Sequence, residues 1–242
     1  MKSYILIAIL FVFGATFAQE GKSYTQSSGW FTGIATIPLN EKFSIDAEVQ
    51  LSRTNFIDDW QQIILRPALH YKLNKEVDFA VGYSYVRNYA YSDYSTPIDA
   101  NENNVWEQVT LSHSSGKVKF SHRFRFEQRF IDDVVITANG YETEGNIFVN
   151  RVRYRFTTTV PLFKISENMP ISGEFFDEIW VNEKTEGVVP TSLNQNWFYV
   201  GVGFPVTKKM TMSVGYLNDY TELKGNSHES NNILYTTIKY KF

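Results

Sequence analysis

Apolar and polar residues alternate in two long segments between positions 117 and 161. Because successive side chains of a β-strand point to opposite faces of its sheet, each segment would present one apolar and one charged face. The apolar face comprises Val118, Phe120, Phe124, Phe126, Phe130, Phe148, Val152, Tyr154 and Phe156. The charged face comprises Lys119, Arg123, Arg125, Glu127, Arg129, Arg151, Arg153 and Arg155. Strands of about twice the usual length of five to six residues favour a barrel in lipid over a soluble sandwich.

The period of two continues along the rest of the chain and indicates eleven strands. They cover residues 30–37, 43–52, 62–73, 77–89, 105–113, 117–130, 148–161, 171–181, 196–204, 210–220 and 232–242. The connections alternate between short and long, as in outer-membrane barrels, which have short periplasmic turns and longer extracellular loops. We therefore predict an all-β fold, a single antiparallel up-and-down transmembrane β-barrel, with its C-terminus in the periplasm and its long loops outside the cell.

The strand number is open between ten and twelve. Bacterial single-chain barrels have an even number of strands, whereas eleven are counted here. A short additional strand between Glu20 and Ser28 would give twelve, which we favour; a miscounted segment would give ten.

Residues 1–18 have the pattern of a cleaved secretory signal peptide. Lys2 precedes an apolar run from Tyr4 to Phe13, and the small residues that end at Ala18 indicate cleavage after that position. The run is shorter than the roughly twenty residues of a membrane-spanning helix. We therefore expect a signal peptide over residues 1–18 and one outer-membrane β-barrel domain over residues 19–242.

Composition agrees with a barrel and limits its partners. Aromatic residues form 16% of the chain, yet the mean hydropathy is slightly negative, as expected when only alternate residues face lipid. The formal net charge of −3 gives no support for a nucleic-acid partner, and the absence of Cys excludes disulfides. We expect no cofactor and no metal. The expected partners are outer-membrane lipid and lipopolysaccharide, the barrel-assembly machinery and small polar solutes.

Several stretches of the chain resemble a known family. They are Trp106-Glu-Gln108, Arg123-Phe-Arg-Phe-Glu-Gln-Arg129, Arg153-Tyr-Arg155, Glu174-Phe175 and Gly201-Val-Gly-Phe204. On these residues the chain resembles a family of uncharacterised Gram-negative outer-membrane barrels, a domain-of-unknown-function family. The aromatic last strand with Tyr240 and terminal Phe242 resembles the C-terminal signal by which such barrels are recognised for insertion. The resemblance implies a fold and a membrane, and it implies no activity.

Charged residues on the inner face are the first candidate site. The predicted lumen-lining residues are Arg66, Glu48, Glu107, Arg123, Arg125, Glu127, Arg129, Arg151, Arg153, Arg155, Glu174 and Glu178. One interpretation is a ladder of salt bridges that keeps desolvated charges paired. The other is a polarised pore whose basic wall attracts anions. A barrel of ten to twelve strands lies between a filled and an open lumen, so size does not decide between them.

The five tryptophans form the second candidate site, because each falls at the long-loop end of a strand. They are Trp30, Trp60, Trp106, Trp180 and Trp197. We favour an extracellular aromatic rim in which the rings lie at the membrane interface. The alternation of residues places Trp106, Trp180 and Trp197 on lumenal faces, so this rim requires bulges that turn them outward. Without such bulges the rings would form an aromatic mouth inside the barrel.

The four histidines give little support for an enzyme. They are His70, His113, His122 and His228. No His shares a face with Ser and an acid at the outer rim, as a barrel hydrolase would require. We therefore predict a porin-like pore for small polar or anionic solutes, without enzymatic activity. The alternatives are a structural or surface-interaction barrel with an occluded, salt-bridged lumen and, with less support, a barrel-embedded lipid hydrolase.

Overall fold

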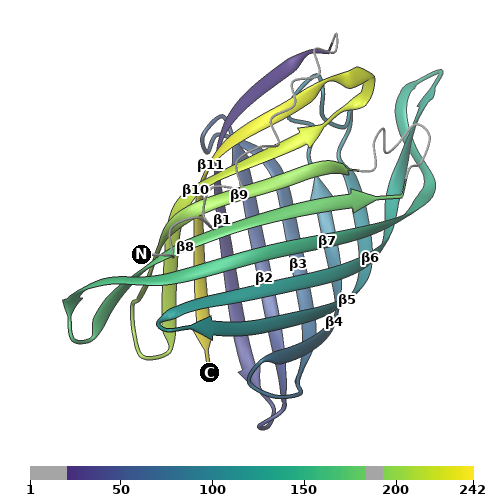
Figure 1. Ribbon diagram of the computed structural model, residues 1–242. Helices are drawn as coiled ribbons and strands as arrows, with labels where there is room; N and C mark the ends of the chain where they lie inside the picture. The colour runs from purple at the N-terminus through teal and green to yellow at the C-terminus, as the bar shows by residue number, and fades with distance from the viewer. Residues whose placement is uncertain (1–20, 184–192) are drawn as a thin grey trace, which may run out of the picture.

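Residues 21–183 and 193–242 are described by a computed structural model, in which they form a closed β-barrel (Figure 1). Its elements are β1 (Ser23–Pro38), β2 (Phe43–Thr54), β3 (Asp59–Lys72), β4 (Val77–Asn88), β5 (Ala100–Ser115), β6 (Val118–Thr137), β7 (Gly140–Ser166), β8 (Met169–Asn182), β9 (Leu193–Pro205), β10 (Met210–Glu222), the short 3₁₀ helix η1 (Lys224–Asn226) and β11 (His228–Lys241). Over these residues, no helix has the length and apolar character needed to cross a membrane.

Each strand pairs in antiparallel fashion with its neighbours in sequence, except at the closure of the barrel. There β1 pairs with β11 in parallel, from Ser23 opposite His228 to Thr36 opposite Lys241. The prediction of a fully antiparallel barrel is therefore wrong at this one seam. A parallel closure requires an odd number of strands when all other pairs are antiparallel, and eleven strands are described.

The additional strand predicted between residues 20 and 28 is absent from the described part of the chain. Residues from Ser23 onward belong to β1, which continues without a turn to Pro38. The expectation of twelve strands is thus wrong over residues 21–183 and 193–242. The predicted signal peptide lies outside the described residues.

The longest strands are β6 and β7, which extend farther than predicted. Residues 132–146, expected to form a polar loop, instead continue the hairpin up to the pair of Thr137 and Gly140. Gly140 has a φ of 120°, a backbone conformation that favours glycine in this tight turn. The resulting ribbon projects beyond the neighbouring loops at the upper end of the barrel (Figure 1).

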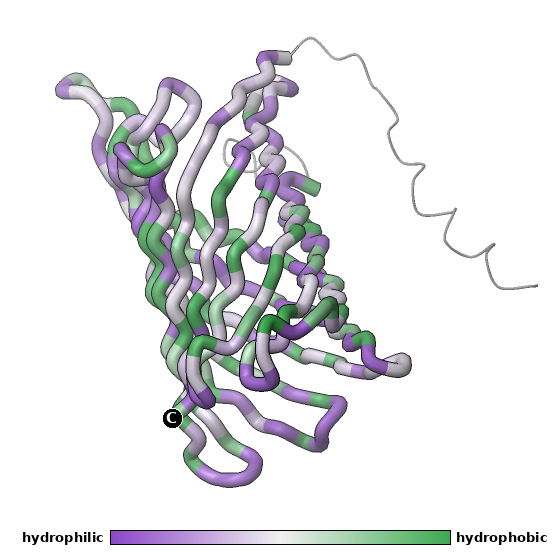
Figure 2. The backbone as a smooth tube through the Cα atoms, turned by 90° about the vertical axis from the view of Figure 1, so that its left-hand side faces the viewer, coloured by the Kyte–Doolittle hydropathy of each residue, from purple (hydrophilic) through white to green (hydrophobic). Residues whose placement is uncertain are grey.

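The outer surface of the barrel is apolar along the middle of the strands. Phe79 on β4, Phe124 on β6 and Val200 on β9 are 40%, 46% and 50% exposed. Figure 2 shows apolar and polar residues alternating along the strands, with polar residues concentrated in the turns at the lower end. Large exposed apolar areas of this kind are unusual in soluble proteins and suit contact with lipid.

Candidate functional site

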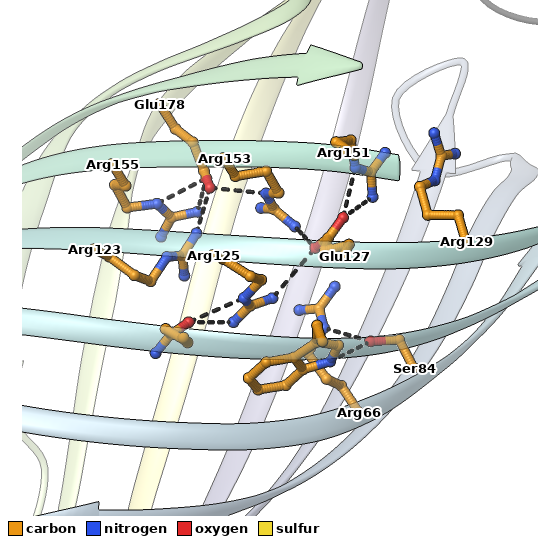
Figure 3. A network of polar contacts seen from close by, with 12 residues as sticks. Arg66, Ser84, Arg123, Arg125, Glu127, Arg129, Arg151, Arg153, Arg155 and Glu178 are labelled. Carbon is orange, nitrogen blue, oxygen red and sulfur yellow. Dashed lines mark hydrogen bonds and ion pairs between the residues drawn. The ribbon is translucent and has the colours of Figure 1, made fainter. Parts of the chain in front are cut away.

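Charged side chains from β6, β7 and β8 meet inside the barrel because of the strand register. Arg123 lies opposite Arg155, and Arg125 lies opposite Arg153. Like charges directly opposite one another in a sheet destabilise the pairing, so these arginines need carboxylates between them. Figure 3 shows how Glu127 and Glu178 lie among the guanidinium groups and separate them.

The Glu178 carboxylate binds three arginines and is completely buried. Its Oε1 accepts hydrogen bonds from Arg123 and, at 2.9 Å, from Arg153 Nε. Its Oε2 accepts from Arg155 Nε at 2.8 Å. With 0% of its side chain exposed, Glu178 has no access to water, and the three cations replace its hydration.

A second carboxylate, Glu127, continues the network toward the end of the barrel that carries the longer loops. Its Oε2 accepts from Arg151 Nε at 2.5 Å, and its Oε1 accepts from Arg153 Nη1 at 3.0 Å. Arg125 Nη1 lies 3.8 Å from the same Oε1. Arg153, only 3% exposed, therefore joins Glu127 to Glu178.

Glu102 is a site residue that the sequence analysis missed. It accepts hydrogen bonds from Arg129 Nε at 2.6 Å and Arg129 Nη2 at 2.7 Å, a bidentate geometry that strengthens the ion pair. The predicted loop extended to residue 104, whereas β5 begins at Ala100. Counting back in steps of two from Trp106 through Asn104 would have placed Glu102 on the inner face.

Glu107 was predicted to line the lumen, and this prediction is wrong. It is an exposed residue of β5, whereas its neighbours Trp106 and Gln108 are buried inside. In the register Glu107 pairs with Val81 on β4 and Phe126 on β6, both on the apolar outer surface. The physical reason is the strict alternation of β5, which cannot place both Trp106 and Glu107 inside.

Across the lumen, Arg66 on β3 forms an ion pair with Glu48 on β2, as their directly opposite positions allow. Arg66 Nε also donates to Ser84 Oγ at 3.1 Å, and Trp106 Nε1 donates to the same hydroxyl at 3.0 Å. The Arg125 guanidinium lies 4.0 Å from the centre of the Trp106 ring, a cation–π contact. These contacts connect β2 to β6 along the barrel wall, in steps between neighbouring strands.

We call these eleven residues the charged belt: Arg66, Arg123, Arg125, Arg129, Arg151, Arg153, Arg155, Glu48, Glu102, Glu127 and Glu178. Seven arginines face four glutamates, an excess of three positive charges, because arginine keeps its proton in proteins. Two buried guanidinium nitrogens, Arg123 Nε and Arg125 Nη1, have no hydrogen-bond partner in the described structure. The belt therefore contains both of the arrangements expected from the sequence: paired charges and a remaining positive potential.

Four of the five tryptophans point into the barrel, so the predicted extracellular aromatic rim is wrong for them. Trp30, Trp106, Trp180 and Trp197 are between 1% and 7% exposed. The β8–β9 register shifts between Trp180 and Val181, yet all four rings keep the inner face that the alternation of their strands assigns. The fifth, Trp60, is 38% exposed and stacks on Tyr89 at 5.9 Å.

The buried rings form a packed cluster beside the charged belt. Its members are Trp30, Phe176, Trp180, Trp197, Tyr199, Leu217 and Ile233. Arg153 lies 3.7 Å from the Trp180 ring centre and Arg155 lies 4.1 Å from that of Phe176. The cluster fills the β8–β11 side of the lumen and supports the guanidinium groups through cation–π contacts.

The connection between β4 and β5, residues 89–99, lies over the mouth of the barrel. Tyr94 stacks on Tyr24 of β1 at 4.1 Å and accepts a hydrogen bond from Gln26 Nε2 at 2.7 Å. Tyr91 donates to Glu229 Oε2 on β11 at 3.1 Å. Burial and the nearby Glu229 carboxylate raise the pKa of the Tyr91 phenol, so it remains a donor. The connection therefore reaches across to the seam strands and covers the opening.

Open space remains below the belt, toward the short turns. A cavity of about 220 Å³ is lined by residues that include Arg123, Arg155, Lys239, Tyr199 and Tyr235. A wider space of about 640 Å³, lined by residues that include Lys75, Lys119 and Thr157, lies nearer the turns. Thr157 lines both spaces, which makes them neighbours inside the barrel.

The remaining predicted site residues occupy different parts of the barrel. Glu174 lines the 220 Å³ cavity but forms no ion pair with the arginines over residues 21–183 and 193–242. Tyr240 and Phe242 are 36% and 59% exposed at the end of β11, with ring centres 4.8 Å apart. These placements agree with a lumenal Glu174 and an exposed aromatic C-terminal segment.

Two of the four histidines, His113 and His122, lie side by side, whereas His70 and His228 lie elsewhere in the barrel. His122 follows the outer-face parity of β6 and stacks against His113 at 5.5 Å, while its Nδ1 lies 2.9 Å from the Tyr154 hydroxyl. His70 lies between Asp78, at 2.8 Å, and Asp46, at 3.6 Å. In the described part of the chain, no group of three His, Cys, Asp or Glu residues is arranged to hold a metal ion.

Comparison with known proteins identifies the family. A family model described as "Protein of unknown function (DUF2490)" matches residues 27–231. The chain belongs to this family. The match confirms the resemblance to a domain-of-unknown-function family that was inferred from the Arg-rich and Gly-rich stretches.

Two further similarities accompany this family match. An uncharacterized protein of Methylorubrum extorquens, MexAM1_META1p0181, is 28% identical over 190 residues, which cover 78% of this chain and 76% of the relative. A solved structure of the NanC porin in a rhombohedral crystal form has a TM-score of 0.47 and 10% identity, covering 84% of this chain and 92% of that chain.

Proposed function

We propose that this protein is an outer-membrane barrel that forms a narrow, anion-selective pore for small solutes. The observation that carries the proposal is the excess of positive charge in the buried charged belt. The seven guanidinium groups of the belt exceed its four carboxylates, so an entering anion gains free energy from the remaining positive charge. The same positive potential would exclude cations.

The apolar outer surface supports a location in the outer membrane, in contact with lipid and lipopolysaccharide. In this proposal residues 1–18 form a cleaved signal peptide, and the barrel-assembly machinery inserts the mature chain. The short turns face the periplasm and the longer connections face outward. Single cysteines test this orientation directly, since the chain has none of its own. Asn139→Cys should react with an impermeant maleimide on intact cells, and Lys117→Cys only after the outer membrane is permeabilised; the reverse pattern would invert the topology.

Planar-bilayer recording tests the pore. Across a KCl gradient, wild-type protein should give current steps. The reversal potential of this current should be displaced from zero toward the equilibrium potential of chloride. Arg125→Gln removes one positive charge of the belt and should move the reversal potential toward zero, whereas Lys208→Gln, in the exposed turn after β9, should leave it unchanged. Cation selectivity would contradict the proposal.

A second function, a structural or surface-interaction barrel with an occluded lumen, is favoured by the packed interior. The aromatic cluster that contains Trp30 and Trp197 fills one side of the lumen, and residues 89–99 cover the mouth. In this case, folded protein would give no current steps at any applied potential. The same recording therefore distinguishes the two functions, because only the pore gives current steps.

We also propose that the barrel is not a lipid hydrolase. His113 and His122 stack on each other, and His70 contacts two acids but, within residues 21–183 and 193–242, no serine hydroxyl. Incubation with phospholipid and mass spectrometry of the products tests this. Lipid cleavage that disappears when His70 is replaced by Ala would overturn it.

A further inference from the structure

The 220 Å³ cavity below the charged belt has two chemically different walls. Arg123 on β6, Arg155 on β7 and Lys239 on β11 supply positive charge. Phe176 on β8 and Tyr199 on β9 supply aromatic faces. Such a pairing of a few placed charges with aromatic surface is typical of small-molecule sites.

The basic side of the cavity has donors that the protein does not use. Arg123 and Arg155 are 18% and 19% exposed, compared with 3% for Arg153, so they reach the open space. Both bind Glu178, yet Arg123 Nη1 and Arg155 Nη1 form no hydrogen bond within the described part of the chain. Lys239 forms no ion pair over residues 21–183 and 193–242. Because guanidinium groups bind oxyanions through paired N–H donors, these residues form a receptor for a carboxylate or phosphate.

The aromatic side of the cavity is held in place by packing. Phe176 and Tyr199 stack with ring centres 4.9 Å apart at 18°, and Tyr235 meets Tyr199 edge-on at 5.9 Å. Gly201 allows this arrangement, since a Cβ there would lie 2.2 Å from the Tyr199 hydroxyl oxygen. A flat aromatic ring of a ligand would pack against this surface, and a linear chain would gain less contact.

We propose that this cavity binds a small monoanion consisting of one flat ring and one oxyanion group. The oxyanion lies among Arg123, Arg155 and Lys239, and the ring packs against Tyr199 and Tyr235. The volume has space for several waters, which such a ligand would displace. Glu174 and Glu48 line the same cavity and disfavour a second negative charge on the ligand. The proposal rests on the basic lumen of the proposed function and specifies its substrate class.

Titration of the purified full-length barrel in detergent tests this site, with tryptophan fluorescence as the readout because Trp197 lines the cavity. Calorimetry provides a second readout. The probes are benzoate, phenyl phosphate, acetate, inorganic phosphate and benzyl alcohol. Benzoate should bind about tenfold or more tightly than the ringless anions, and benzyl alcohol should not saturate. Phenyl phosphate carries close to two negative charges at neutral pH, so it should bind more weakly than benzoate, and tighter binding of phenyl phosphate would contradict the monoanion.

Two variants locate the bound probe. Lys239→Gln should weaken benzoate about tenfold by removing one charge-assisted contact, and Tyr235→Leu should remove the preference for benzoate over acetate. Lys208→Gln, in the exposed turn after β9, is the matched control and should bind as wild type. Thermal unfolding of each variant shows whether it is folded.

The outcomes separate this site from the pore. Equal affinities for benzoate and acetate, no saturation by any ring-bearing anion, or unchanged benzoate binding by Lys239→Gln would overturn the site. Benzoate binding without current steps would support the site and contradict the pore. Anion-selective current without benzoate binding would support the pore and overturn the site.

Discussion

Gly82 lies directly opposite Trp106, and the indole ring occupies the space where a Cβ on Gly82 would be. A Cβ built at Gly82 would lie 2.2 Å from Trp106 Cζ2. Trp106 is 1% exposed and donates to Ser84, which also contacts Arg66. The glycine thus permits a large ring to lie flat inside the barrel and to support the charged belt.

Gly82→Ala should lower the stability of the barrel by about 1–3 kcal/mol, the usual cost of overpacking a filled interior. Thermal unfolding in detergent, followed by circular dichroism, measures the change. Gly33→Ala on β1 is the matched control, because the nearest atom to a Cβ there is 3.9 Å away. Equal losses of stability in the two variants would show that the contact between Trp106 and Gly82 does not contribute to the stability of the barrel.

Glu178→Gln should destabilise the barrel by about 3–5 kcal/mol, because it removes the buried counter-charge of Arg123 and Arg155 and one of the two carboxylates that pair with Arg153. The same change at Glu107, on the apolar outer surface, should cost nothing or increase stability in lipid. Urea titration in lipid vesicles provides the comparison. If both substitutions have the same effect, the belt does not require its carboxylates.

Tyr91→Phe should loosen residues 89–99 over the mouth without altering the barrel. The variant loses the hydrogen bond to Glu229, which corresponds to about 0.5–1.5 kcal/mol for a typical hydrogen bond. Hydrogen–deuterium exchange at residues 90–99 should become faster by up to about tenfold. Tyr141→Phe, at the exposed tip of the β6–β7 ribbon, should not change exchange in this segment.

Glu102→Gln should weaken the attachment of Arg129 and increase the positive potential at the upper end of the belt. Arg129 would lose its bidentate ionic partner while its Nη1 keeps the contact to Asn182 at 3.2 Å. We expect a loss of about 3–5 kcal/mol in stability. If the pore proposal is correct, the bilayer reversal potential should also shift farther toward that of chloride. A shift in the other direction would argue against control of selectivity by belt charge.

Local alternation predicted much of this molecule. The positions of the strands follow from a period of two, and so does the inward direction of the arginines on β6 and β7. This pattern can be seen without knowledge of the neighbouring strands. The tryptophans were misplaced because the preference of indole rings for membrane interfaces was given more weight than the parity of their own strands. Glu107 shows a similar error, because the alternation of β5 that places Trp106 and Gln108 inside excludes Glu107 from the inner face.

The pairing of charges could not be predicted in the same way. Which carboxylate reaches which guanidinium depends on the register between strands, and a slip of one residue would place Glu127 and Glu178 outside. The parallel closure is also invisible locally, because β1 has the same alternation whichever way its partner runs. Residues 132–146 were assigned to a loop because they are polar, a property that a solvent-exposed ribbon shares.

The parallel seam between β1 and β11 has a consequence for how the barrel is built. Every other strand pair joins neighbours in sequence, whereas the seam joins Ser23 to His228, across almost the whole described chain. Closing so long a segment has the largest entropic cost of any pairing in the molecule, so it should be the last to form and the first to separate. If an assembly machinery inserts the barrel into a membrane, as proposed, β1 and β11 would be the two free edges of an open sheet and available to that machinery until they pair.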